Sequence, residues 1–326
     1  MGRHVTSAVT ALAVALAAAL LLQAPASGQA VWARDTPKLP MARTWVAQKA
    51  KLPPYTPPRT PDGVPDLQGS WNGAGGDNNS YLEDHEYVDR TTPAQESFVS
   101  DPPDGKVPYT PWALEKRNEF LRGLARGWPG ETGERLHVSP GSFCLNYMPV
   151  FSFDAQEIVQ KLGSVIMLNE ETFRVIPTDG RPPLTQNGKF FLGVSRGRWE
   201  GDTLVVEVTS LNGKGWFDST GQFYSENTRM IERWRLVDAN TIDYEVTVED
   251  PTIYTRPWKM NFPKRRAGTA PPGPRGVSIA SSLPPVADNS RERELWETAC
   301  YEGNGPTVAG VRSLGFKWFS GVTPPK

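Results

Sequence analysis

Apolar and polar residues alternate with a period of two from Gly163 onward, and this alternation predicts a series of antiparallel strands. Within residues 190–209, the dipeptide Gly201-Asp202 is typical of a tight two-residue hairpin turn. The turn fixes the register, since a slip of one residue would move every side chain to the other face. One face then pairs Trp199 with Leu204, Gly197 with Val206 and Ser195 with Val208, and the other gains Arg196 opposite Glu207.

A second hairpin is predicted to turn at Asp238-Ala239-Asn240. Its polar face is expected to bring three pairs of opposite charge together, and this favours the register. These pairs are Arg235 with Asp243, Arg233 with Glu245 and Arg229 with Glu249. The opposite face receives Leu236 with Ile242, Trp234 with Tyr244, Glu232 with Val246, and Met230 with Val248.

Glu232 is a candidate catalytic residue because the apolar face of this hairpin should turn inward, and Glu226 lies in phase with it six residues earlier. A buried carboxylate is costly unless it is paired, hydrated or used in chemistry. Desolvation beside Trp234 would raise the pKa of Glu232 toward the range of a general acid or base. The structural alternative is a hydrogen bond to a buried backbone group, or an ion pair with an inward Arg174 or Arg198. The residues leave both interpretations open.

Proline content organises the rest of the chain. Residues 31–65 are predicted to form an extended arm, because six prolines lie between Lys51 and Pro65 and exclude a helix or a central strand there. A second proline-rich stretch, at about 264–289, is predicted to be a long exposed loop.

One short helix is expected between these two stretches. Thr110 and Pro111 suit its N-cap and first helical position, and leucines recur at helical spacing to about Ala125. The remaining pattern is that of strands, so residues 66–326 are expected to form a single β domain.

The N-terminus has the order of an export signal. Arg3 precedes an uncharged apolar run from Val5 to Leu22, and small residues follow up to Ala30. We expect residues 1–30 to be a signal peptide and the mature protein to be secreted or periplasmic, with no membrane span after cleavage. The alternative is an uncleaved membrane anchor, since the run approaches the length of a spanning helix.

Export bears on the two cysteines, Cys144 and Cys300. In an oxidising compartment two cysteines favour a disulfide, and we predict that these two pair. The alternative is two separate buried thiols.

Charge and motif content exclude several function classes. The 35 Lys and Arg residues balance 36 Asp and Glu residues, so no polybasic surface for nucleic acid is expected. The mature chain keeps only His85 and His137, without the spacing of a zinc site, and it has no Gly-x-Ser-x-Gly and no phosphate-binding glycine-rich loop. We therefore expect neither a metal nor a cofactor.

Two resemblances add to this picture. Gly69-Ser70-Trp71 resembles the Gly-x-Trp motif that opens the first strand of lipocalins, whose up-and-down barrels hold small apolar ligands. Most of the mature chain is similar to a large group of uncharacterised exported bacterial proteins. That similarity runs through Pro65-Asp66-Leu67-x-Gly69-x-Trp71, the segment Gly197-Arg198-Trp199-Glu200-Gly201-Asp202 and Tyr254-x-x-Pro257-Trp258. The second resemblance implies export and architecture but no reaction. The chain departs from that group at Tyr224, where His is common.

Together these features predict a mainly β protein, an antiparallel lipocalin-like barrel or a sandwich with one short helix and proline-rich loops. We expect it to bind a small, largely apolar ligand in an aromatic-lined cup. The alternatives are a cofactor-independent isomerase, lyase or hydrolase that uses an inward Glu, and an envelope structural or interaction protein. The candidate ligand-binding residues are Trp71, Phe191, Trp199, Trp216, Trp234 and Arg198, and the candidate catalytic residues are Glu232, Glu226, Asp218 and Tyr244.

Overall fold

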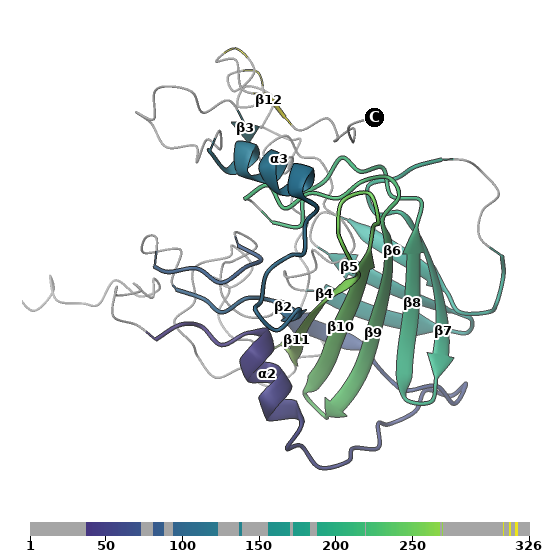
Figure 1. Ribbon diagram of the computed structural model, residues 1–326. Coiled ribbons are helices and arrows are strands. Elements are labelled where there is room, and N and C mark those ends of the chain that lie inside the picture. Colours follow the sequence, from purple (N-terminus) through teal and green to yellow (C-terminus); the bar gives the residue numbers. More distant parts are fainter. Residues whose placement is uncertain are drawn as a thin grey trace, which may run out of the picture.

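One antiparallel sheet curls into a nearly closed barrel and forms the body of the protein (Figure 1). The computed structural model describes residues 37–72, 81–87, 94–122, 137–138, 156–169, 172–182, 188–218, 220–267, 269, 309, 313 and 317–318. The predicted signal peptide, Cys144, Cys300 and most of the predicted loop at 264–289 lie outside these residues. Within them, no helix is long and apolar enough to cross a membrane.

The barrel strands follow the order β6-β5-β4-β1-β11-β10-β9-β8-β7, with β2 paired to β11 beside them. Two short strands, β3 and β12, form a separate parallel pair. The strands are β1 (Gly69–Asn72), β2 (Val99–Asp101), β3 (His137–Val138), β4 (Gln156–Lys161), β5 (Ser164–Asn169), β6 (Phe173–Pro177), β7 (Val194–Glu200), β8 (Thr203–Thr209), β9 (Arg229–Asp238), β10 (Thr241–Glu249), β11 (Trp258–Arg266) and β12 (Lys317–Trp318).

The registers predicted for the two hairpins are confirmed. In the β7–β8 hairpin Trp199 lies opposite Leu204, and in the β9–β10 hairpin Trp234 lies opposite Tyr244. The second hairpin turns through Ala239 and Asn240, with an irregularity between Thr241 and Ile242. The inner faces of these strands carry the core, so the alternation of apolar residues did reveal which side of the sheet is buried.

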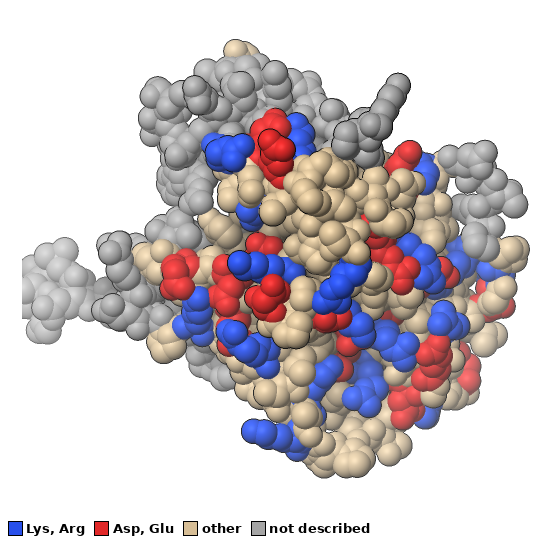
Figure 2. Space-filling view, viewed as in Figure 1, with Lys and Arg blue, Asp and Glu red and all other residues tan. Residues whose placement is uncertain are grey.

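The predicted charge pairs are only partly formed, although the residues concerned do lie opposite each other. Arg229 contacts Glu249 at 2.8 Å as expected. Arg233 instead pairs with Glu200 of β7, and Glu245 pairs with Lys259 of β11. In a sheet each outer side chain has neighbours on two sides, and the choice between them cannot be made from one hairpin. Basic and acidic side chains are accordingly interspersed over this face (Figure 2).

Two helices with described bounds flank the barrel, one more than predicted for this part of the chain. Helix α3 (Pro111–Arg122) lies within the expected range. Helix α2 (Ala42–Lys49) falls in the segment predicted to be an extended arm. Trp45 donates its indole N–H to Asp243 at 2.8 Å, and Lys49 contacts the same carboxylate at 3.0 Å. These contacts with β10 stabilise a helix that is too short to be stable alone.

The barrel closes where β6 and β7 lie side by side. Among the described residues these strands share no backbone ladder, and both stand at the ends of the strand order. A Cβ atom on Gly197 would lie 2.8 Å from Cγ2 of Thr178 and 2.9 Å from Cγ2 of Ile176. Glycine at position 197 therefore lets β7 approach β6.

The two ends of the barrel differ. At one end α3 packs Phe120 against Trp216 and Phe223, with ring centroids 5.5 and 5.8 Å apart. The other end carries the β7–β8 and β9–β10 turns, and residues 51–65 pass along it without helix or ladder strand. One end is therefore covered by a helix and the other by an extended segment (Figure 1).

Replacement of Gly197 tests the closure of the barrel. We expect Gly197→Ala to lower the free energy of unfolding by about 1–3 kcal/mol, because the added methyl group would force β7 away from β6. Urea unfolding followed by circular dichroism measures this change. Arg198→Ala, on the exposed face of the same strand, is the control and should shift stability by less than about 0.5 kcal/mol. Equal effects of the two changes would contradict the close contact.

Candidate functional site

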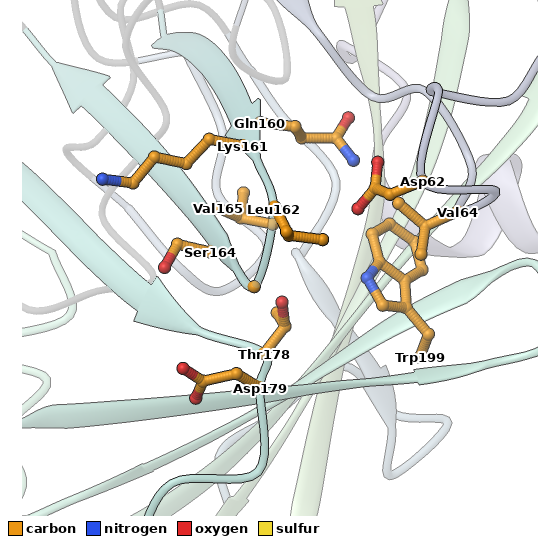
Figure 3. A pocket seen from close by; sticks show the side chains of 11 residues that line it. Asp62, Val64, Gln160, Lys161, Leu162, Ser164, Val165, Thr178, Asp179 and Trp199 are labelled. Carbon is orange, nitrogen blue, oxygen red and sulfur yellow. The ribbon is translucent and has the colours of Figure 1, made fainter.

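A cavity of about 290 Å³ opens at the end of the barrel opposite α3. Its walls come from the β4–β5 turn, the residues after β6, the end of β7 and the extended segment that precedes β1 (Figure 3). This brings together parts of the chain that are far apart in sequence. The lining residues are Asp62, Val64, Gln160, Lys161, Leu162, Gly163, Ser164, Val165, Thr178, Asp179 and Trp199.

The β4–β5 turn forms one wall because it packs tightly on the end of β6. Gly163 adopts φ +71°, which an L side chain rarely adopts, and its carbonyl accepts a hydrogen bond from the Thr178 amide at 2.9 Å. Asp179 is held beside this turn by Arg181, whose Nε lies 2.8 Å from its carboxylate. Hydrogen bonding to Arg181 lowers the pKa of Asp179 to about 2, so Asp179 is ionised at neutral pH.

The extended segment supplies the opposite wall and is fixed by its polar contacts. Arg59 forms an ion pair with Asp202 in the β7–β8 turn. Gln160 of β4 donates to the carbonyl of Pro65 at 3.0 Å and accepts from the amide of Leu67 at 2.6 Å. The segment is therefore tied both to β4 and to the β7–β8 hairpin, across the mouth of the cavity.

The lining is mixed in polarity. Val64, Leu162, Val165 and Trp199 supply apolar surface, and Leu162 is 84% exposed although it is aliphatic. In Figure 3 the Leu162 side chain extends across the cavity in the direction of Trp199. The site offers a flat aromatic wall, aliphatic contacts and polar groups at its edge, a combination typical of small-molecule sites.

A second group of polar residues lies inside the barrel around Glu232. Arg174 of β6 contacts both carboxylate oxygens of Glu232, at 3.2 and 2.8 Å, and donates to Ser195 Oγ of β7 at 3.0 Å. Tyr244 donates its hydroxyl to Glu232 at 2.8 Å, and burial raises its pKa well above the ordinary value. Glu232 is fully buried, as predicted, and of the two arginines considered as partners the structure selects Arg174.

This arrangement suits an architectural role for Glu232. Both of its oxygens accept charge-assisted hydrogen bonds, and the Arg174 side chain that faces it is only 4% exposed. Arg198 lies on the outer face instead and pairs with Glu200 at 2.7 Å. The expectation that Arg198 faces the interior is wrong, because the strand alternation that turns Trp199 inward turns Arg198 outward.

The other candidate catalytic residues are not beside Glu232. Glu226 is exposed in the turn before β9, so the expected phase with Glu232 is wrong; the strand begins only at Arg229. Asp218 is buried at the α3 end and accepts hydrogen bonds from the amides of Leu82 and Thr220, each at 2.8 Å. Only Tyr244 among them joins Glu232.

The candidate ligand-binding residues are likewise dispersed. Trp199 lines the cavity, whereas Trp216 is buried beside Phe120 of α3. Trp71 and Trp234 are fully buried within the barrel. Phe191 is half-buried in the stretch before β7 and does not line the cavity. Most of these aromatic residues are thus packed in the interior, and of the six candidates only Trp199 lines the cavity.

Basic side chains also lie among the interior aromatic residues. Lys264 is fully buried, with Nζ 5.5 Å from the ring centroid of Trp234, and the Arg266 guanidinium lies 4.2 Å from the ring centroid of Trp71. The Trp71 indole N–H donates to the Leu67 carbonyl at 2.9 Å. Trp71 of β1 is thus held by a cation–π contact with Arg266 and by a hydrogen bond to Leu67.

Sequence reasoning missed most of the cavity. Asp62, Val64 and Leu162 were not singled out, because they lie in turns and extended chain where no periodicity marks an inward face. The available signal was the aliphatic Leu162 directly before a turn glycine, which is unusual in an exposed turn. Within the described parts of the chain, no three His, Cys, Asp or Glu side chains are grouped to hold a metal ion.

Comparison with known proteins adds no relative to this description. No family model matches the chain, and no curated protein or solved structure is significantly similar to it. The resemblances to lipocalins and to the exported bacterial group therefore rest on the short motifs alone.

Substitutions at the buried ion pair test its architectural role. We expect Glu232→Gln to lower the free energy of unfolding by about 3–5 kcal/mol, because Arg174 would keep a buried charge without its counter-charge. The double variant Arg174→Met/Glu232→Leu removes both charges and should be more stable than Glu232→Gln. Urea unfolding of the two variants and the wild type makes the comparison. A double variant less stable than Glu232→Gln would contradict this account.

Asp218 should make stability depend on pH. Burial raises its folded-state pKa from 3.8 to about 6, so the folded state holds a proton that the unfolded state has released. This stabilising contribution is complete below pH 3.8 and is lost as pH rises to about 6, a change on the order of 3 kcal/mol. Unfolding free energies measured from pH 3.5 to 7 should therefore fall more steeply with rising pH in the wild type than in Asp218→Asn. Parallel curves would contradict the assignment.

Proposed function

We propose that the protein is exported and binds a small, largely apolar ligand in the cavity at the open end of its barrel. The observation that carries this proposal is the cavity of about 290 Å³ beside Trp199, close to the lower limit of about 300 Å³ for small-molecule sites. Val64, Leu162 and Val165 supply the remaining apolar contacts. Exposure of Leu162 to solvent is unfavourable in the free protein, and a ligand would relieve it.

Binding accounts for the described residues better than acid–base catalysis does. The inward Glu232 already accepts hydrogen bonds from Arg174 and Tyr244, and it does not line the cavity. A general acid or base must reach the proton that it transfers. No observation places Glu232 within reach of a molecule in the cavity.

Removal of the aromatic wall tests the proposal. The exported protein is purified, and small molecules that accompany it are extracted with organic solvent and identified by mass spectrometry. We expect a compound at a fixed ratio to the wild-type protein. For Trp199→Ala, the ratio of this compound to protein should be lower by about tenfold or more, because buried aromatic contacts dominate binding energies.

Phe173→Ala is the matched control. Phe173 is also an exposed aromatic residue, 65% accessible, but it lies at the start of β6 and outside the cavity. It should retain as much ligand as the wild type. Equal retention by Trp199→Ala would contradict the site, and a wild-type protein that carries no compound and binds none when offered would contradict the function.

A further inference from the structure

One carboxylate that lines the cavity, that of the exposed Asp62, forms no ion pair among the described residues. Asp62 accepts a hydrogen bond from Thr60 Oγ1 at 2.6 Å, which leaves acceptor positions on its carboxylate unused. The nearest arginine in sequence, Arg59, forms its ion pair with Asp202, and its other guanidinium nitrogen donates to the Gly63 carbonyl at 3.4 Å rather than to the Asp62 carboxylate. Among the described residues, no lysine or arginine forms an ion pair with Asp62. Figure 3 shows its carboxylate beside the Trp199 indole.

The other two charged residues that line the cavity are Asp179 and Lys161. The Asp179 carboxylate is held by the Arg181 guanidinium, with Nε contacts of 2.9 and 2.8 Å. Lys161 is exposed, and Figure 3 shows its side chain extending away from the cavity. A bound molecule would thus meet the negative charge of Asp62 rather than a positive one.

Trp199 and Asp62 favour the same kind of chemical group. The face of an indole attracts cations more strongly than any other side-chain ring. A carboxylate accepts short, charge-assisted hydrogen bonds from an ammonium group. The aliphatic side chains of Val64 and Leu162 lie next to these two residues and suit an uncharged, apolar body.

We infer that the ligand is a small organic amine, with an ammonium group at Asp62 and Trp199 and an apolar body against Val64 and Leu162. This inference rests on the proposed function and specifies the class of molecule that the cavity binds. A volume of about 290 Å³ limits the body to a single ring or a short alkyl chain.

Three probes with one body and different heads test the inference. 2-Phenylethylamine is cationic at neutral pH, 2-phenylethanol is neutral and 3-phenylpropionate is anionic. Isothermal titration calorimetry with the full mature protein measures each dissociation constant. We expect the amine to bind about tenfold or more tightly than the alcohol, because a hydrogen bond to a charged group is the stronger kind. The carboxylate should bind most weakly.

Two variants separate the charge from the cavity. Asp62→Asn keeps an acceptor for Thr60 but removes the negative charge, so amine affinity should fall to about that of the alcohol while alcohol affinity stays unchanged. Asp238→Asn is the matched control. Asp238 is the last residue of β9, at the same end of the barrel, and accepts a hydrogen bond from the Asn240 amide at 2.7 Å, but it does not line the cavity. This variant should bind all three probes as the wild type does.

The outcomes distinguish the inference from the function. Equal or tighter binding of the alcohol or the carboxylate would overturn the amine assignment and leave small-molecule binding intact, provided that Trp199→Ala weakens it. An amine preference that survives Asp62→Asn would also overturn the assignment. Failure of all three probes to bind at millimolar concentration would overturn both the inference and the proposed cavity.

Discussion

The barrel depends on a constraint at its seam: β6 and β7 meet without a backbone ladder in the described residues, so side chains have to join them. Arg174 does this from inside, with hydrogen bonds to Ser195 of β7 and to Glu232 of β9. Arg196 of β7 adds a contact to the chain that follows β6, because its guanidinium donates to the Pro182 carbonyl at 2.9 Å. A buried ion pair contributes little net stability, but loss of one partner is costly. The Arg174–Glu232 ion pair therefore serves mainly to hold β6 against β7 and β9 in one specific arrangement.

The closure also determines where an opening is possible. At the α3 end, aromatic side chains fill the barrel, and Asp218 ties the loop before β9 to Leu82. Near the other end the seam contains Gly197. Because glycine has no side chain, Ile176 and Thr178 can pack directly against the backbone of β7 there. The cavity lies directly beyond this contact, bounded by Thr178 and Trp199. The position of the candidate site thus follows from the way the two edge strands meet.

The local sequence pattern was sufficient to predict the registers of the two hairpins. It was insufficient to predict the long-range contacts that join the hairpins to the rest of the protein. Trp199–Leu204 and Arg229–Glu249 could be predicted because a turn and two matching faces fix a register over a few residues. The inward position of Glu232 followed from the same register, but its partner lies 58 residues away in β6. Helix α2 depends on the contact between Trp45 and Asp243, 198 residues apart. Such pairings leave no periodic trace in the sequence, and the same holds for Asp62 beside Trp199.

The proline-rich segment gains a physical explanation from its position over the cavity. A chain that crosses the end of a barrel outside the ladder needs another partner for every backbone amide that it buries. Proline has no amide hydrogen, and this lowers the number of donors to be satisfied. Gln160 supplies partners for two of the groups that remain, the Pro65 carbonyl and the Leu67 amide. A segment of this composition can therefore form one wall of the cavity while its backbone stays outside the sheet, and it places Asp62 and Val64 in that wall.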